Sequence, residues 1–308
     1  MFDANAIINL PPFSPGNAQQ PEIKAYLSFY QNDFAAKGLA ESQSIGRLPL
    51  GGFSIFTHLI TAMSAKGCVL LLHGYFDHSA NLRPLTEYFL RRGFSVILFD
   101  LPGHGLSSGD KSVIHSFQEY QAVLEALIAY FKQQIDFPLS LIGGHSTGGA
   151  IAMQYILNQN TPDVEKLLLI APLVEPIAWP WIKWQMAFAS PFMQRIKRKF
   201  KQNTSNEDFW YFIQHKDPLQ TQYVSVAWLN ALKHWLKEDF AQATPKQLPV
   251  LMLQGTCDNT VNGKKNAKQL IEKFPQMRCQ ALKGAGHQLI NESEFFQTLW
   301  QVALADFI

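Results

Sequence analysis

Residues 139–157 read LSLIGGHSTGGAIAMQYIL, and this stretch decides the fold. Its first part is a short apolar run typical of a buried strand, and its last part is typical of a helix. Between them lies a G-x-S-x-G pattern, Gly144 to Gly148, with Ser146 at its centre. Glycine on both sides permits a tight turn, and the following helix directs N–H groups toward the serine oxygen. We therefore predict that Ser146 is a nucleophile; the alternative is an ordinary turn in which Ser146 only caps the helix.

Apolar runs of the same kind recur along the chain and are separated by helical stretches. The runs lie at residues 68–73, 94–100, 139–144, 167–172, 250–255 and 277–282. Helices are expected around residues 22–37, 82–92, 117–131 and 294–305. Continuous apolar strands that alternate with helices predict an α/β fold, with a mostly parallel central sheet and helices on both faces. Ligand sites in such sheets lie beyond the carboxyl ends of the strands.

The alternation breaks between residues 172 and 245, a stretch rich in Trp, Phe, Lys and Pro without an obvious strand. We interpret this stretch as a helical cap, or lid, inserted after the sixth strand. The predicted division is an N-terminal segment at 1–45, a core at 46–171 and 246–308, and the cap at 172–245.

A serine hydroxyl needs a base to take its proton, and two loops supply candidates for a base and an acid. Asp258 follows the strand at 250–255, and His287 lies in a glycine-rich turn after the strand at 277–282. Taken singly, they would be a turn aspartate and a loop histidine. Because all three residues follow strands in the order Ser, Asp, His, we predict a catalytic triad of Ser146, Asp258 and His287.

An oxyanion hole is expected from the loop after the strand at 68–73. In this arrangement one backbone donor comes from that loop and the other from the residue after the nucleophile. The predicted donors are the N–H groups of Tyr75 and Thr147. The alternative is a plain turn at the end of a strand.

Bulk properties exclude several classes of partner. The net charge of the 308 residues is +2, so no strong field is available to attract nucleic acid. Cys68, Cys257 and Cys279 are widely spaced and odd in number, which argues against a disulfide framework or a zinc site. With no apolar stretch of ~18 residues and no N-terminal signal pattern, a cytoplasmic protein is expected.

Four motifs carry a resemblance to a known family, and they read HGYFDHS (73–79), DLPGHGLS (100–107), GHSTGG (144–149) and the Asp258 and His287 loops. Over roughly residues 50–300 the chain resembles the monoacylglycerol lipase and lysophospholipase branch of the α/β-hydrolases, of the serine aminopeptidase S33 type. The resemblance implies a cap over an acyl pocket and hydrolysis of single-acyl-chain lipid esters without metal or organic cofactor. Members that grip glycerol carry an arginine shortly after HS, where this chain has Asn81.

Substrate contacts are expected from the site loops and from the cap. The expected contact residues are Asp77, His78, His145, Trp179 and Trp184. The cap stretch 177–201 combines indoles with a basic run, which suits a peripheral contact with a membrane. The alternative is that its aromatic side chains pack onto the core and its charges face water.

The predicted function is a carboxylic ester hydrolase that acts on a small-molecule or lipid ester through an acyl-enzyme. An aminopeptidase-like or thioesterase activity on the same triad is an alternative. A catalytically inactive ligand-binding module is the alternative outside enzymes. The oligomeric state is left open.

Overall fold

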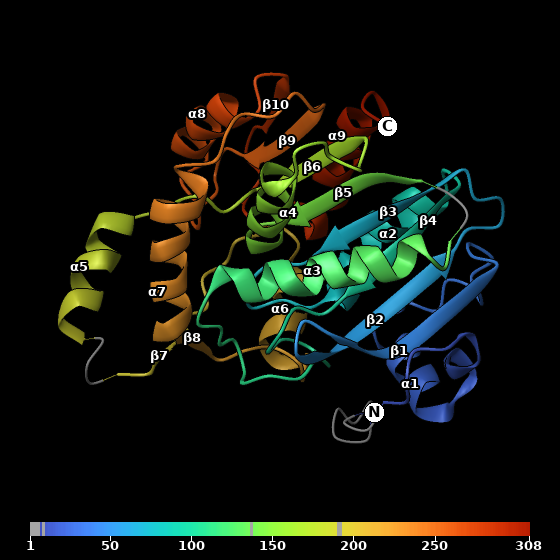
Figure 1. Cartoon of the computed structure of the whole chain (residues 1–308). Coiled ribbons are helices and arrows are strands. Elements are labelled where there is room, and N and C mark those ends of the chain that lie inside the picture. Colours follow the sequence, from blue (N-terminus) through green and yellow to red (C-terminus); the bar gives the residue numbers. More distant parts are fainter. Residues whose placement is uncertain (1–6, 8–9, 136–137, 190–192) are drawn as a thin grey trace.

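The computed structural model describes residue 7 and residues 10–135, 138–189 and 193–308 (Figure 1). These residues form an eight-stranded sheet in the order β1-β2-β4-β3-β5-β6-β9-β10. β2 is antiparallel to β1 and to β4, and the pairs from β4 to β10 are parallel. The strands are β1 Ser42–Leu50, β2 Phe53–Thr61, β3 Gly67–Leu72, β4 Phe94–Phe99, β5 Leu139–His145, β6 Lys166–Ile170, β9 Val250–Gly255 and β10 Met277–Leu282.

Helices cover both faces of the sheet, which confirms the predicted fold class (Figure 1). The strand β3 shows why its sequence is apolar throughout: Cys68, Leu70 and Leu72 enter one buried cluster, and Val69 and Leu71 enter the other. The first cluster includes side chains of α3 Phe117–Lys132, α4 Thr147–Asn158 and α8 Gly263–Lys273. The second includes those of α2 Arg83–Leu90 and α9 Glu294–Ala305.

The N-terminal part of the chain differs from its prediction. The helix expected at 22–37 ends early, since α1 spans Pro21–Phe29 and Gln31 has a positive φ of 55°. The predicted boundary at residue 45 falls inside β1. This strand was not recognised because it contains Gly46 and Pro49, residue types that are depleted in strands.

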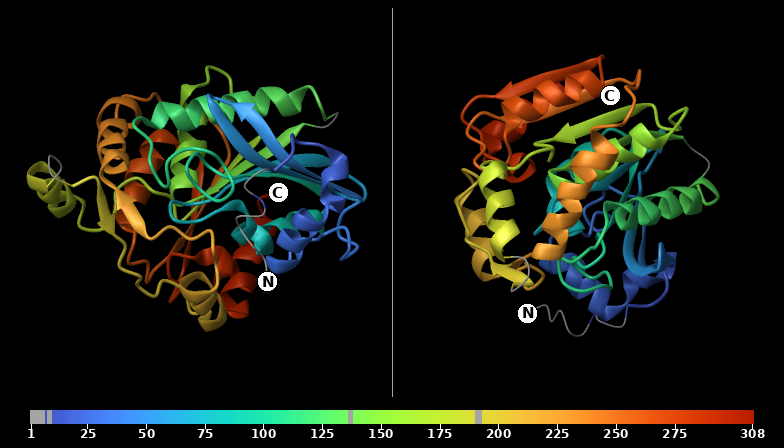
Figure 2. Two further views of the ribbon diagram at one scale, coloured as in Figure 1. Left: turned by 90° about the horizontal axis from the view of Figure 1, so that it is seen from below. Right: turned by 60° about the vertical axis from the view of Figure 1, so that its left-hand side comes forward.

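Residues 172–245 are here called the cap segment. Its helices are α5 Trp179–Ala189, α6 Glu207–His215 and α7 Val226–His234, and η3 Trp235–Phe240 continues α7. Its described part from α5 to α7 lies beyond the carboxyl ends of the strands (Figure 1 and both views of Figure 2), and after η3 the chain returns alongside α8 toward β9. The expectation of no strand was wrong, because β7 Arg195–Lys197 pairs antiparallel with β8 Tyr223–Ser225. Three-residue strands are too short to show a periodic pattern. Residues 190–192 of the predicted aromatic stretch lie outside the described residues.

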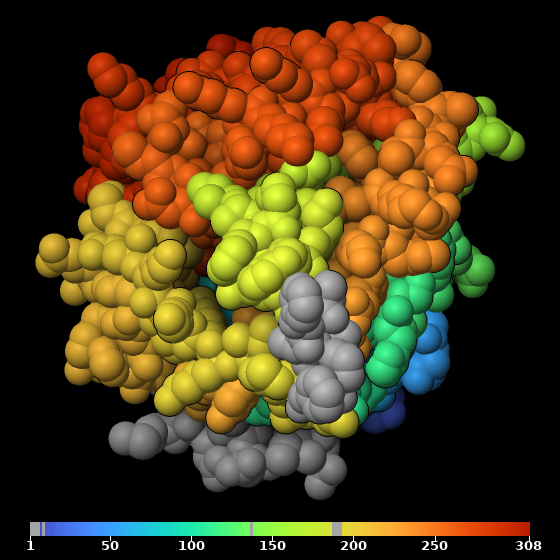
Figure 3. All heavy atoms as spheres, turned by 90° about the vertical axis from the view of Figure 1, so that its left-hand side faces the viewer, coloured from blue at the N-terminus to red at the C-terminus, as the bar shows by residue number. Residues whose placement is uncertain are grey.

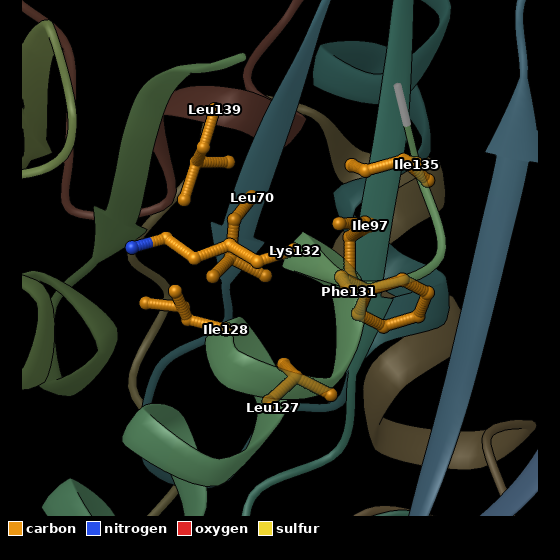
Figure 4. A pocket seen from close by; sticks show the side chains of 8 residues that line it. All are labelled: Leu70, Ile97, Leu127, Ile128, Phe131, Lys132, Ile135 and Leu139. Carbon is orange, nitrogen blue, oxygen red and sulfur yellow. The ribbon is translucent and has the colours of Figure 1, made fainter. Parts of the chain in front are cut away.

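A small apolar cavity lies between α3 and the sheet, at a distance from the loops that follow the strands (Figure 4). Its volume is about 30 Å³, and the Lys132 amino group points away from the other lining side chains. The lining residues are Leu70, Ile97, Leu127, Ile128, Phe131, Lys132, Ile135 and Leu139. Apolar cavities of this size stay dry, so we regard it as a packing space.

Candidate active site

Ser146 occupies a sharp turn between β5 and α4. Its backbone has φ 52° and ψ −113°, a conformation that is strained for any residue other than glycine. The glycines beside it leave no room for a side chain. A Cβ on Gly144 would lie 2.2 Å from the backbone carbon of Gly148, and one on Gly148 would lie 2.4 Å from the Leu72 oxygen. The turn therefore depends on both glycines, as the sequence pattern predicts.

The two predicted oxyanion donors border this turn. A Cβ added to Gly74 would lie 3.2 Å from the Ser146 Cβ, so the loop after β3 passes directly over the serine. Within the described residues, the N–H groups of Tyr75 and Thr147 donate to no protein acceptor. Both groups are thus available to a developing negative charge.

His287 and Asp258 are in direct contact. The distance from His287 Nδ1 to Asp258 Oδ2 is 2.8 Å, and both side chains are almost fully buried. Burial acts to raise the pKa of Asp258, but His287 and the N–H groups of Val261 and Thr260 outweigh it and lower that pKa to about 2. The ionised carboxylate orients the imidazole and leaves Nε2 as the basic nitrogen.

His287 also lies against His145, the residue that precedes Ser146. His145 Nε2 is 3.0 Å from the His287 carbonyl oxygen, and the two ring centroids are 4.8 Å apart. In the described part of the chain, no hydrogen bond involves Ser146 Oγ. The hydrogen bond between a nucleophilic serine and its base is often long until substrate binds. Burial is the main cause that lowers the pKa of His145 to about 3, so this imidazole is neutral.

The Tyr75 side chain connects the core to the cap segment. Its hydroxyl donates to the Ser112 carbonyl at 2.7 Å and accepts from the Ser225 N–H at 3.0 Å. Its ring stacks on Trp228 of α7, with centroids 4.1 Å apart and an interplanar angle of 28°. Sequence reasoning assigned only the backbone of Tyr75 and had no signal for these partners.

Asp77 and His78 belong to a buried polar cluster rather than to an open surface. His78 Nε2 lies 2.9 Å from Asp217 Oδ2, and the Tyr30 hydroxyl donates to Asp217 Oδ1 at 2.8 Å. Asn81 donates to Asp77 at 2.7 Å. Burial acts to lower the pKa of His78, but Asp217 outweighs it and raises that pKa to about 9. The Asp217 carboxylate of the cap segment is thus bound to both His78 of the core and Tyr30 of the N-terminal segment.

A cleft of about 370 Å³ opens behind this cluster, where α1, α6 and α9 approach the loop after β3. Tyr30 and Asn81 lie in its wall.

The two predicted tryptophan contacts lie in different places. Trp179 is 3% exposed and packs in the larger buried cluster. Trp184 is 54% exposed and stacks on Trp181 with centroids 4.8 Å apart. Among the described residues, no group of three or more His, Cys, Asp or Glu side chains is arranged to hold a metal ion.

A serine at a strand–helix elbow, with a His–Asp pair on loops after later strands of a mostly parallel sheet, defines the α/β-hydrolase class. Comparison with protein families agrees, since the model of the serine aminopeptidase S33 family matches residues 63–294. The chain belongs to this family.

Characterised relatives and solved structures extend the comparison. The chain is 26% identical to phospholipase YtpA of Bacillus subtilis over 73% of its length and 89% of that protein. It is 27% identical to the monoglyceride lipase of Rattus norvegicus, over 74% of this chain and 77% of that one. A soluble variant of monoglyceride lipase from Saccharomyces cerevisiae superposes with a TM-score of 0.71 at 19% identity, over 83% of this chain and 91% of that one. The chain is therefore a lipase- or lysophospholipase-like hydrolase.

Proposed function

We propose that this protein hydrolyses carboxylic esters of single-acyl-chain lipids, lysophospholipids or monoacylglycerols, with Ser146, His287 and Asp258 as a catalytic triad. The observation that carries the proposal is the 2.8 Å contact of His287 with Asp258, beside the strained turn of Ser146. Relatives whose names include phospholipase, probable lysophospholipase and monoglyceride lipase support the substrate class.

The reaction follows from the positions of these groups. Ser146 Oγ attacks the ester carbonyl carbon while His287 Nε2 takes its proton. The N–H groups of Tyr75 and Thr147 hold the oxyanion, and Asp258 stabilises the imidazolium. His287 then protonates the leaving alcohol, and water frees the acyl group by the same roles in reverse.

Replacement of Ser146 by alanine tests the proposal. We expect Ser146→Ala to lower kcat on a p-nitrophenyl ester by roughly 10⁴-fold or more and to abolish labelling by a fluorophosphonate probe. Ser28→Ala, at an exposed serine of α1, is the matched control and should behave as wild type. Near-normal turnover by Ser146→Ala would show that Ser146 is not the nucleophile. A wild-type protein that the probe does not label would favour an inactive binding module.

A substrate panel separates esters from the other acyl compounds. Esters, thioesters and aminoacyl amides with one acyl group should be compared by kcat/KM. We expect esters to be preferred. A preference for amides or thioesters would show that the triad catalyses an aminopeptidase-like or thioesterase reaction instead.

Peripheral contact with a membrane through the cap segment is part of the proposal. Trp181 and Trp184 present their stacked rings to solvent, and Arg195 and Lys197 of β7 are exposed nearby in the chain. Apolar rings with basic neighbours suit an anionic lipid surface. Sedimentation with anionic and neutral liposomes tests this, and absence of binding to both would refute it. No helix among the described residues is long and apolar enough to cross a membrane.

A cytoplasmic location is also proposed, and it rests on cysteine chemistry. Cys68, Cys257 and Cys279 are free, and the last two are exposed. Exposed free thiols suit a reducing compartment.

A further inference from the structure

The cap segment places one arginine over the loop that carries a predicted oxyanion donor. Arg198 follows β7, and its guanidinium carbon lies 4.2 Å from the ring centroids of both Phe76 and Phe200. Phe76 is the residue after Tyr75, and Gly74 of the same loop lies against Ser146. The guanidinium therefore lies over the loop that borders the reacting serine.

The guanidinium is held in place but is not saturated with partners. Nη1 donates to Gln220 Oε1 at 3.0 Å and to the Thr221 carbonyl at 3.3 Å. Within the described part of the chain, Nε and Nη2 of Arg198 have no acceptor, and neither is fully enclosed. Figure 3 shows the surface hollowed between α5 and the yellow stretch that follows it, with atoms of the core visible below. Two fixed donors thus remain open to a ligand.

The charge of Arg198 also lacks a counterpart. No ion pair of the described residues includes Arg198. The nearest acids, Asp217 and Asp77, are bound to His78 and Asn81 respectively. Burial lowers the pKa of Arg198 to about 10, and the two aspartates offset this only in part. The group remains cationic at neutral pH, and a half-buried cation without a carboxylate is costly unless an anion reaches it.

We propose that Arg198 binds the phosphate of the substrate's headgroup, so that the preferred lipid is a lysophospholipid rather than a monoacylglycerol. A planar guanidinium with two free donors matches two phosphate oxygens, which a hydroxyl group of glycerol cannot replace. The phosphate of a lysophospholipid is separated from the scissile ester only by glycerol carbons, and the ester must sit at the Tyr75 N–H. This inference rests on the proposed function and names the substrate class of the same site.

The test compares two substrates that share one acyl chain and differ in the phosphoglycerol headgroup, lysophosphatidylglycerol and monoacylglycerol. In the wild type, kcat/KM should be higher for lysophosphatidylglycerol. Arg198→Gln should lower the ratio of the two kcat/KM values about 30-fold, which corresponds to about 2 kcal/mol. Arg198→Lys keeps the charge without the planar pair of donors and should give an intermediate ratio. Lys199→Gln, at the exposed neighbouring cation, is the matched control and should leave the ratio unchanged.

Inorganic phosphate provides a measurement on the wild type that does not depend on folding of a variant. It should inhibit hydrolysis of a neutral p-nitrophenyl ester competitively in the millimolar range, and Arg198→Lys should weaken that inhibition. Inhibition by phosphate without a preference for lysophosphatidylglycerol would assign the site to free phosphate and overturn the headgroup proposal.

Three results would overturn the inference. These are equal kcat/KM for both lipids in the wild type, an unchanged ratio in Arg198→Gln, or an equal loss on both substrates, which indicates a purely structural arginine. Each of them leaves the triad proposal intact, because Ser146 would still label and p-nitrophenyl esters would still be cleaved. Failure of the proposed function is recognised separately, by the absence of labelling at Ser146.

Discussion

Removal of one oxygen atom from Tyr75 tests whether the cap segment positions the predicted oxyanion hole. Tyr75→Phe keeps the backbone N–H and the stacked ring but removes the hydroxyl that joins Ser112 to Ser225. The Ser112 carbonyl and the Ser225 N–H each lose a hydrogen-bond partner. Each buried unpaired group costs about 1–3 kcal/mol. We take about 2–4 kcal/mol for the two groups together, below the upper limit, because both hydrogen bonds to the Tyr75 hydroxyl are only partly buried.

This free energy sets the expected change in thermal stability. An unfolding entropy of about 2.1 cal/mol/K per residue over 308 residues predicts a fall in Tm of about 3–6 °C. Activity should fall as well, because the loop that holds the Tyr75 N–H loses one of its attachments to the cap segment, the hydrogen bond to Ser225. Loss of an oxyanion donor costs about 10²–10³-fold in kcat, so a displaced donor should cost about 10–100-fold.

The assay is steady-state hydrolysis of a short p-nitrophenyl ester, with Tm measured on the same samples. We expect kcat to fall while KM changes less than about threefold, since the oxyanion forms only in the transition state. Tyr223→Phe removes the hydroxyl of an exposed tyrosine in β8 and is the matched control. A lower Tm with unchanged kcat would show that the hydroxyl stabilises the fold without positioning the donor. A rise in KM equal to the fall in kcat would also refute the reasoning.

Two further changes follow from the buried contacts. The pKa of His78 is raised from 6.5 to about 9, so its stabilising contribution is complete below pH 6.5 and is lost as the pH rises through 9. Urea denaturation at pH 6.5 and 9.5 should show this loss in the wild type and a smaller one in Asp217→Asn; equal losses would contradict the ion pair. Gly148→Ala should yield no folded protein, because its Cβ would lie 2.4 Å from the Leu72 oxygen, whereas Gly16→Ala meets nothing within 4 Å. Circular dichroism compares the two, and a folded Gly148→Ala would refute the packing argument.

The inner strands of the sheet were predictable because they are buried on both faces. In β3 every residue is apolar or small and buried, so the run is recognisable without knowledge of its neighbours. The antiparallel pair β1 and β2 lies at one edge, and β1 carries Gly46 and Pro49. Its position depends on packing against α1 and against residues 12–14, which no local pattern encodes.

The position of the candidate site was predictable for those residues that lie in loops directly after strands. The loops of Ser146, Asp258 and His287 come after parallel strands, and such ends meet at one edge of a sheet. The contacts of the cap segment do not follow from this rule. Asp217 is 139 residues from His78 and 187 from Tyr30, and each of the three is an ordinary residue in its own stretch of sequence. Only the folded chain shows that they form one cluster.

The loop after β3 contacts both the cap segment and Ser146. Three of its residues contact the cap segment in different ways: Tyr75 through Ser225 and Trp228, Phe76 through Arg198, and His78 through Asp217. The same loop supplies a predicted oxyanion donor and lies against the serine. A shift of the cap segment must therefore either break these contacts or move the donor. Because the loop is fixed on both sides, the position of the cap segment and the position of the predicted oxyanion donor are linked, and we expect kcat rather than binding alone to respond to changes in the cap segment.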